Sequence, residues 1–308
     1  MIEVENLRRV YGSVVAVDGL SFTARKGEIF GLLGPNGAGK TTTIGCISGL
    51  LHPTGGRVKV MGCDMSADGR AARRHLGVVP QEIALYGDLS AAENLMYWGG
   101  AQNLHGRLLR ERVREALELT GLADRAVEPS ARFSGGMKRR LNFACGIVHR
   151  PAVLLLDEPT AGVDPQSRVR LLEIIRGLAR GGACVLYTTH YMEEAEALCD
   201  RIAILDRGRI VAQGTLAELR AMLEARDLVR FTGVFPPVEV RAAMARGGVE
   251  VLQLEENLLA LEMADASSRL PAIFAALAAA GAETRGVSIS RPSLESLFLK
   301  LTGKELRE

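Results

Sequence analysis

The first sixty residues alternate between short apolar runs and glycines, a pattern typical of β-strands joined by tight turns. Strands are predicted in IEVENLRRV, VVAVDGLSFTA, EIFGLLG and RVKVMG. A helix is predicted to begin at about Lys40, because Ile44, Ile47 and Leu51 recur at roughly helical spacing. LGVVPQ, which ends at Gln81, predicts another short strand. Strands therefore alternate with helices from early in the chain.

Residues 88–150 change to helical periodicity. In LLRERVREALELTGL four apolar residues fall on one face, as in an amphipathic helix. The runs VLLLDEP at 153–159 and ACVLYTTH at 183–190 are continuously apolar, which is typical of buried parallel strands. RIAILDRGRIVAQG predicts a hairpin that turns at 206–208. The pattern predicts an α/β domain over 1–224 with a helical subdomain inserted at about 88–150.

The pattern changes again after about residue 225. Its apolar segments predict strand, helix, strand, strand, helix and strand, the order of a ferredoxin-like α+β domain. SLESLFLKLTG predicts a closing helix. We therefore expect a small accessory domain over 225–308. It could support self-association, sense a ligand or brace the first domain; of these roles we expect self-association.

Composition narrows the class of protein. The 308 residues carry a net charge of +2, which does not indicate a nucleic-acid partner. The basic runs 70–74 and 138–140 are interpreted as solvated helix faces. Five cysteines without a C-x-x-C pair suggest buried free thiols in a reducing compartment. The N-terminus lacks the apolar core of a signal peptide, and no apolar run reaches the roughly 20 residues of a membrane span.

GPNGAGKT at 34–41 matches the phosphate-loop pattern G-x-x-x-x-G-K-[ST], between a predicted strand and a predicted helix. Glycines let backbone N–H groups turn toward phosphate oxygens, and the helix N-terminus adds positive potential. The lysine would reach the β- and γ-phosphates, and the first threonine would ligate Mg²⁺. The predicted ATP-binding residues here are Gly34, Pro35, Asn36, Gly37, Ala38, Gly39, Lys40, Thr41 and Thr42.

Three polar residues follow the two later apolar strands. Asp157 ends the first, where a ligand crevice forms in open parallel sheets and where a carboxylate could hold Mg²⁺. Glu158 is the next residue, so its side chain points in a different direction from that of Asp157, and it could act as general base toward an attacking water. His190 ends the second strand, on the same sheet edge, and could contact the γ-phosphate and Glu158.

FSGGMKRR at 133–140 is a second anion-binding pattern, in which a serine and two glycines precede a helix. With GPNGAGKTT, VVPQ, VLLLDEP, AGVDP and TTH in this order, residues 1 to about 220 resemble an ABC-family ATP-binding subunit. In that family two subunits stack head to tail. The resemblance implies that Ser134, Gly135 and Gly136 bind the ATP held by a second copy.

The resemblance also implies further roles. Tyr11 would stack on adenine, and Gln81 would contact Mg²⁺ and the attacking water. Asp164 would cross the dimer interface. Two positions depart from the family pattern: Met137 stands where glutamine is usual, and Phe133 where leucine is usual.

The tail resembles the ABC-2-type export subgroup, which includes multidrug, antibiotic-resistance and polysaccharide exporters. The implied function is an ATPase subunit that uses ATP and Mg²⁺ to power export. Its partners would be a second copy of itself and a separately encoded polytopic permease. The chain would be cytoplasmic and attached through that permease to the inner face of the membrane. A soluble ABC machine and a nucleotide-gated scaffold are the alternatives.

Overall fold

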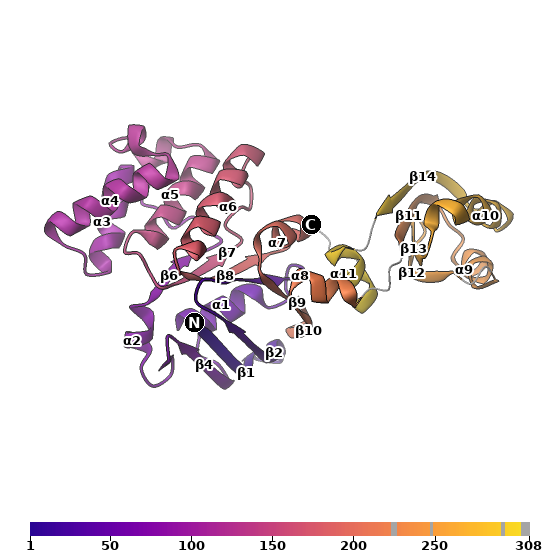
Figure 1. Cartoon of the computed structure of the whole chain (residues 1–308), viewed down its shortest axis with the longest axis horizontal. Helices are drawn as coiled ribbons and strands as arrows, with labels where there is room; N and C mark the ends of the chain where they lie inside the picture. Colours follow the sequence, from indigo (N-terminus) through magenta and orange to yellow (C-terminus); the bar gives the residue numbers. More distant parts are fainter. Residues whose placement is uncertain (223–226, 247–248, 291–292, 303–308) are drawn as a thin grey trace. The chain divides into compact units, whose positions relative to one another are not determined.

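The computed structural model describes residues 1–222, 227–246, 249–290 and 293–302 (Figure 1). The chain divides into two compact units, Met1–Gln213 and Gly214–Glu308. This division precedes the predicted boundary at 224/225. Helix α8 (Leu216–Ala221) contacts helix α11 (Leu294–Thr302), which places α8 in the second unit.

A six-stranded sheet of order β10-β9-β3-β8-β7-β6 forms the centre of the first unit. Each of the pairs β9–β3, β3–β8, β8–β7 and β7–β6 is parallel. Consequently, the carboxyl ends of these five strands meet at one edge of the sheet. The six strands of this sheet are β3 (Ile29–Leu33), β6 (Leu76–Val79), β7 (Val153–Asp157), β8 (Cys184–Thr189), β9 (Arg201–Asp206) and β10 (Arg209–Gly214).

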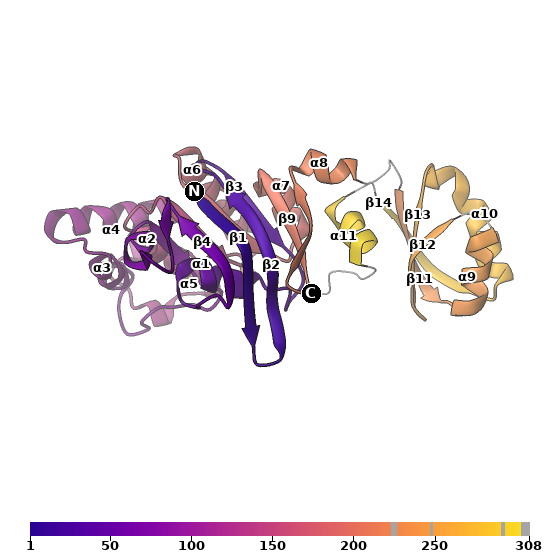
Figure 2. The same ribbon diagram turned by 90° about the horizontal axis from the view of Figure 1, so that it is seen from below.

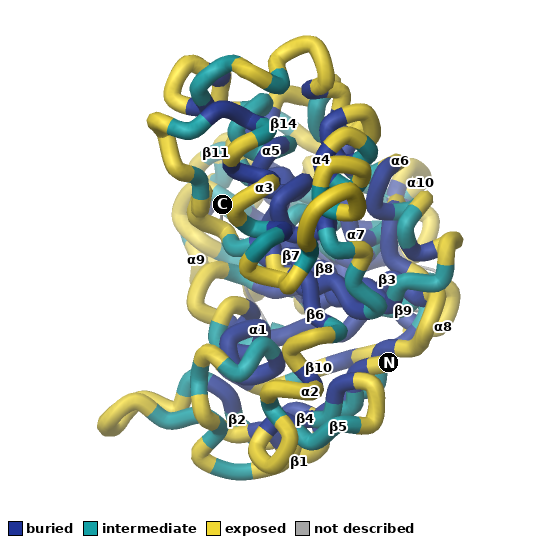
Figure 3. The backbone as a smooth tube through the Cα atoms, turned by 90° about the vertical axis from the view of Figure 1, so that its left-hand side faces the viewer, coloured by how far each residue is buried: buried dark blue, intermediate teal, exposed yellow. Residues whose placement is uncertain are grey.

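An antiparallel sheet of order β2-β1-β4-β5 covers one side of the parallel sheet, and helices α6 and α7 lie on the opposite side (Figures 1 and 2). One apolar cluster joins the two sheets and α1, and includes Leu7, Val17, Ile44 and Leu155. The elements are β1 (Ile2–Tyr11), β2 (Val14–Ala24), β4 (Gly55–Val60), β5 (Cys63–Asp64), α1 (Lys40–Ser48), α6 (Pro165–Arg180) and α7 (Met192–Leu198). Figure 3 shows buried backbone concentrated along β3, β7 and β8.

The predicted helical insertion is present. Helices α3 (Ala91–Ala101), α4 (Gly106–Thr120) and α5 (Gly135–Ile147) contact one another and share a separate apolar cluster. Ser90 caps α3 through a capping box with Glu93. Three short elements complete the unit: α2 (Gly69–Arg73), η1 (Ala123–Arg125) and η2 (Ser130–Arg132).

The second unit has the predicted element order, and its antiparallel sheet of order β12-β13-β11-β14 is the ferredoxin-like arrangement. Val229, Phe231 and Leu261 pack in the cluster that α9 and α10 complete. Leu228 packs with Leu299 of α11, on the opposite face. The elements are β11 (Asp227–Val234), α9 (Pro237–Arg246), β12 (Glu250–Leu254), β13 (Leu258–Met263), α10 (Ala266–Ala279) and β14 (Glu283–Ser290).

Within the described ranges, every helix is too short or too polar to cross a membrane.

Candidate active site

The predicted residues of the phosphate loop and the predicted catalytic residues lie at the carboxyl ends of four parallel strands. The phosphate loop follows β3, and Gln81 lies two residues beyond β6. Asp157 ends β7, and His190 follows β8 directly. Because these strands are parallel neighbours, their ends bring together segments that are far apart in the sequence.

The phosphate loop has the backbone that its glycines allow. Gly37 and Gly39 have φ angles of 81° and 104°, which other residues rarely adopt. A Cβ atom at Gly39 would lie 2.6 Å from the carbonyl oxygen of Ala16. Helix α1 begins directly after Gly39 and has no side-chain N-cap, so its first backbone N–H groups are available to an anion.

Solvent exposure varies along the loop. Asn36, Gly37 and Thr41 are exposed, Pro35 and Thr42 are half-buried, and Gly34, Ala38, Gly39 and Lys40 are buried. The Lys40 side chain is only 5% exposed. Its Nζ donates hydrogen bonds to the carbonyl oxygens of Gly34 (2.8 Å) and Pro35 (3.2 Å) and lies 3.0 Å from Glu158 Oε1.

Glu158 is the residue on which the site converges. Its Oε2 lies 3.1 Å from His190 Nδ1 and accepts a hydrogen bond from Gln81 Nε2 (3.4 Å). Burial raises the pKa of the carboxyl, but Lys40 and His190 together outweigh burial and hold the pKa below its ordinary value. Glu158 is therefore a carboxylate at neutral pH. Its φ of 46° is unusual for a non-glycine residue and is typical of constrained active-site positions.

Asp157 lies beside Glu158 in a different environment. Its Oδ1 accepts a 2.6 Å hydrogen bond from Thr188 Oγ1, and Thr41 also donates to its carboxylate. Burial raises the pKa of Asp157 despite these bonds. A buried carboxylate next to a threonine hydroxyl fits Mg²⁺, which binds few protein oxygens and completes its shell with phosphate and water. In the described part of the chain, no cluster of three His, Cys, Asp or Glu residues provides an all-protein metal cage.

The second anion-binding pattern begins α5. Ser134 is the exposed N-cap residue, and its Oγ accepts a hydrogen bond from the Met137 N–H (3.3 Å). The exposed Gly135 leaves open space where a side chain would stand. A Cβ atom at Gly136 would lie 2.9 Å from Asp164 Oδ2, so the fold brings this pattern next to Asp164.

The two departures from the family pattern have a packing explanation. Phe133 is buried in the apolar cluster of the helical subdomain, and Met137 packs against the same cluster from its edge. An apolar side chain suits both positions.

Asp164 and Tyr11 remain candidates. Asp164 is the N-cap of α6 and accepts a hydrogen bond from the Ser167 N–H (2.9 Å), which holds the pKa of Asp164 below its ordinary value. Tyr11 ends β1 with its side chain 41% exposed, and the Arg9 guanidinium lies 4.5 Å from its ring centroid. One face of the predicted adenine-stacking ring therefore has a cation over it.

The sequence did not predict a role at the site for two residues of α5. Arg139 Nη1 donates to the Gln81 carbonyl oxygen, and Asn142 accepts from the Ala84 N–H (3.0 Å) and donates to the Pro80 carbonyl oxygen (3.4 Å). The helix therefore holds both ends of the loop that carries Gln81. Asn142 lies in an apolar stretch, where a lone polar residue is the signal that could have revealed it.

The interpretation of 138–140 as a solvated face is wrong for two of its residues. Burial lowers the pKa of Arg139, which contacts the Gln81 loop. Arg140 donates to the carbonyl oxygens of Thr120 (2.9 Å) and Gly121 (3.3 Å), at the end of α4. The sequence shows the charges but not which backbone carbonyls they reach.

Comparisons with known proteins agree with this geometry. Residues 17–161 match the ABC transporter family. The chain is 42% identical to the linearmycin resistance ATP-binding protein of Bacillus subtilis, with full coverage of both chains. It is 38% identical to the daunorubicin/doxorubicin resistance ATP-binding protein of Streptomyces peucetius (98% of this chain, 92% of that one).

Solved structures give the same result. An ATP-binding subunit of an ABC transporter superposes with a TM-score of 0.67 at 32% identity, over 72% of this chain and 92% of that one. A dimeric ATP-binding cassette in a post-hydrolysis state with ADP and Pi superposes with a TM-score of 0.65 at 26% identity, over 70% of this chain and 99% of that one. From the site, the full-length relatives and these structures together, the chain belongs to the ABC transporter family, as an ATP-binding and ATP-hydrolysing subunit of the export type.

Proposed function

We propose that two copies of this chain form a head-to-tail dimer with ATP at both sites and power export through a separate permease. The observation that carries the proposal is the set of contacts around Glu158, which joins the phosphate-loop lysine, Gln81 and His190 in one buried cluster. The chain carries the residues that we assign to both sides of an ATP, the phosphate-loop cluster on one side and the 134–136 pattern on the other. Two identical copies would therefore form two complete sites.

In this proposal Glu158 is the general base. Lys40 binds the β- and γ-phosphates and cannot also neutralise Glu158, so ATP binding releases the carboxylate. Glu158 then accepts a proton from the water that attacks the γ-phosphate, and ADP and phosphate leave. His190 holds Glu158 on the side away from Lys40, and Gln81 orients the water. Tyr11 stacks on the adenine.

Mg²⁺ would be held by Asp157, Thr41 and Gln81. It would neutralise charge on the phosphate oxygens.

The second side of each ATP comes from the partner copy. Ser134 and the first N–H groups of α5 point a positive helix end at the γ-phosphate of the other subunit. Gly135 allows the phosphate to approach the backbone closely, because no atom of the described residues occupies the space where a side chain would stand. Asp164 lies beside Gly136, and in this proposal it connects the two sites across the interface. ATP then stabilises the dimer, and hydrolysis releases it.

A groove of about 350 Å³ is our candidate dock for a cytoplasmic helix of the permease. Its walls come from the helical subdomain at Trp98 and from the core at Leu50 and Val78, and Ala84 of the Gln81 loop lies in it. Leu50 is 82% exposed and Val78 is 37% exposed, so apolar side chains of the groove are open to a partner. A helix docked here would press on the Gln81 loop. The chain would then lie at the inner face of the membrane through its partner.

The relatives indicate the class of cargo. They are named for resistance to linearmycin, resistance to daunorubicin and export of Nod factor. We infer that the permease exports a drug, antibiotic or polysaccharide-type cargo. The soluble-machine alternative has no support among these names, and the ionised Glu158 beside His190 argues against a scaffold without turnover.

The dimer is tested with Glu158→Gln, which removes the proposed base but keeps the phosphate loop. Size-exclusion chromatography with light scattering should show a dimer with ATP and a monomer without it. Adding Ser134→Arg to this variant should abolish the dimer while each monomer still binds ATP. A persistent monomer in Glu158→Gln, or loss of ATP binding in the double variant, would refute the head-to-tail arrangement.

The permease is tested by affinity purification of the tagged chain from its native membranes in mild detergent, followed by mass spectrometry. We expect a polytopic protein at equal stoichiometry. Leu50→Asp should abolish its recovery, and Val127→Asp, which changes an 88% exposed valine outside the groove, should not. Recovery with ribosomal or DNA-associated proteins alone would favour the soluble-machine alternative.

A further inference from the structure

A second cavity lies far from the nucleotide edge, at the amino ends of the parallel strands. Its volume is about 560 Å³, within the range of sites for small organic molecules. Pro151 and Ala152, which precede β7, form one part of its wall, and Ala183, which precedes β8, forms another. Glu158 follows the opposite end of β7, and the phosphate loop follows the corresponding end of β3 in the same sheet. An occupant of this cavity would not compete with ATP.

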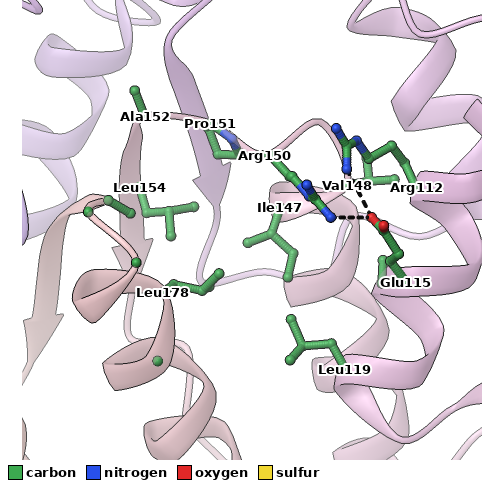
Figure 4. Close-up of a pocket in the computed structure, with 15 residues that line it drawn as sticks. Arg112, Glu115, Leu119, Ile147, Val148, Arg150, Pro151, Ala152, Leu154 and Leu178 are labelled. Atoms are coloured by element: carbon green, nitrogen blue, oxygen red, sulfur yellow. Dashed lines mark hydrogen bonds and ion pairs between the residues drawn. The ribbon is translucent and has the colours of Figure 1, made fainter. Parts of the chain in front are cut away.

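The interior of the cavity is apolar. Leu119 of α4, Ile147 of α5, Leu154 of β7 and Leu178 of α6 line it (Figure 4). Its walls therefore come from both the helical subdomain and the parallel-sheet core. A molecule bound here would contact both parts at once.

A charged group of three residues stands at one side. Glu115 Oε2 lies 3.0 Å from Arg112 Nη1 and 2.8 Å from Arg150 Nη2, so two guanidinium groups converge on one carboxylate oxygen (Figure 4). These are the three charged residues among the fifteen that line the cavity. The hydrogen bond from Arg112, and to a smaller extent the charge of Arg150, hold the pKa of Glu115 below its ordinary value. Glu115 is therefore ionised at neutral pH, and the three residues together carry a net charge of +1.

The excess positive charge is accessible. The Arg150 side chain is 62% exposed and that of Arg112 is 20% exposed. A guanidinium has five N–H donors in a fork that suits carboxylate, sulfonate or phosphate oxygens. Because ion pairs at a solvent-exposed surface add little net stability, an external anion can share or replace the contact of Arg150 with Glu115.

We propose that this cavity binds a small amphiphilic anion, with its apolar body among the four aliphatic side chains and its head group on Arg150 and Arg112. Such a ligand would tie α4 to the segment that leads into β7, as the Arg150–Glu115 ion pair already does. The proposal does not depend on the export function, because binding is measured without turnover.

Gly177 provides a direct way to fill the cavity. It lies in α6, lines the cavity, and leaves open space where a side chain would begin. Gly177→Leu should therefore place four carbons in the cavity while raising helix propensity. Gly100→Leu is the matched control, because Gly100 is also a helical glycine with open space around its missing Cβ but does not line this cavity.

The probes are octanoate, octanol and octylammonium, measured by calorimetry and ligand-observed NMR on the full chain with saturating ADP. The nucleotide keeps anionic probes out of the phosphate loop. We expect saturable binding of octanoate that weakens at least tenfold in Gly177→Leu and is unchanged in Gly100→Leu. Arg150→Gln should weaken octanoate about fivefold to tenfold and leave octanol unchanged, because a charge-assisted hydrogen bond is lost.

Equal binding of octylammonium and octanoate would overturn the assignment of an anionic head. Octanoate binding that is unaffected by Gly177→Leu would place the probe elsewhere and overturn the site. Arg150→Gln tests the site independently if Gly177→Leu fails to fold.

Discussion

The Lys40 ammonium lies 3.0 Å from the Glu158 carboxylate, and both side chains are almost fully buried. The same ammonium is the one that the proposed mechanism assigns to the phosphates of ATP. Binding ATP must therefore exchange a carboxylate partner for a phosphate partner. The pair links nucleotide binding to the protonation of the proposed general base.

Replacing Lys40 should raise the pKa of Glu158. Lys40→Met removes the charge that offsets burial, whereas Lys40→Arg keeps a cation and should raise the pKa less. A carbon-13 NMR titration of glutamate carboxyls, assigned with Glu158→Gln, measures the shift. An unchanged pKa in Lys40→Met would show that Lys40 does not control Glu158.

The same pair predicts a pH dependence of stability. A Glu158 pKa below the ordinary 4.5 means that folding favours the ionised carboxylate. This contribution is complete above pH 4.5 and is lost as the pH falls through the lowered pKa. Lys40→Met should therefore flatten the fall in unfolding free energy over that acidic window. Urea denaturation from pH 7 down to pH 3 measures it; parallel curves for the two proteins would contradict the prediction.

Asn142→Leu should lower kcat about tenfold with little change in the KM for ATP. The substitution releases both ends of the Gln81 loop from α5, and misplacing a positioning group by about 1 Å can lower a rate up to about a hundredfold. Asn142→Asp keeps the acceptor for the Ala84 N–H and should restore part of the rate. Steady-state ATPase assays measure both parameters.

Asn94→Leu is the matched control for that prediction. Asn94 is also a buried asparagine of the helical subdomain, but it holds the neighbouring loop at Tyr86 and Leu89. The Asn94→Leu substitution should lower the melting temperature without lowering kcat per folded molecule. If both asparagine variants lose kcat equally, the effect is structural and Asn142 does not position Gln81.

Met137→Gln should destabilise the chain by about 1 kcal/mol, or roughly 2–4 °C in melting temperature, because an amide replaces an apolar side chain at the edge of the helical-subdomain cluster. Turnover should stay within about twofold. Met96→Gln, at a 41% exposed position of α3, should leave the melting temperature almost unchanged. A large gain in turnover for Met137→Gln would show instead that the site lacks the family amide.

Removal of the second unit tests its predicted role in self-association. Truncation after Gln213 follows the compact-unit boundary and removes α8 together with α11, its packing partner. In the Glu158→Gln background, ATP binding to the monomer should persist while the ATP-dependent dimer weakens, as sedimentation measures. Unchanged dimer affinity would leave the domain with a sensing or bracing role.

Much of the fold could be predicted because its signals are local. Apolar runs of strand length, glycines at turns and helical periodicity depend on neighbours in the chain, and they revealed the strands β3, β7 and β8 and the order of elements in the second unit. The division between the compact units depends on α8 contacting α11, residues that are far apart in the sequence, so no local pattern could place it.

The sequence by itself determined the chemistry of the site. GPNGAGKT, the two acids within VLLLDEP, and His190 are recognisable because each function requires particular residue types at particular spacings. Only the tertiary structure decided which of these groups touch: the pairing of Lys40 with Glu158, the reach of Arg139 and Asn142 to the Gln81 loop, and the packing of Met137. These are contacts between distant segments, set by how parallel strands align their ends and by which face of α5 is turned inward, and no local pattern encodes them.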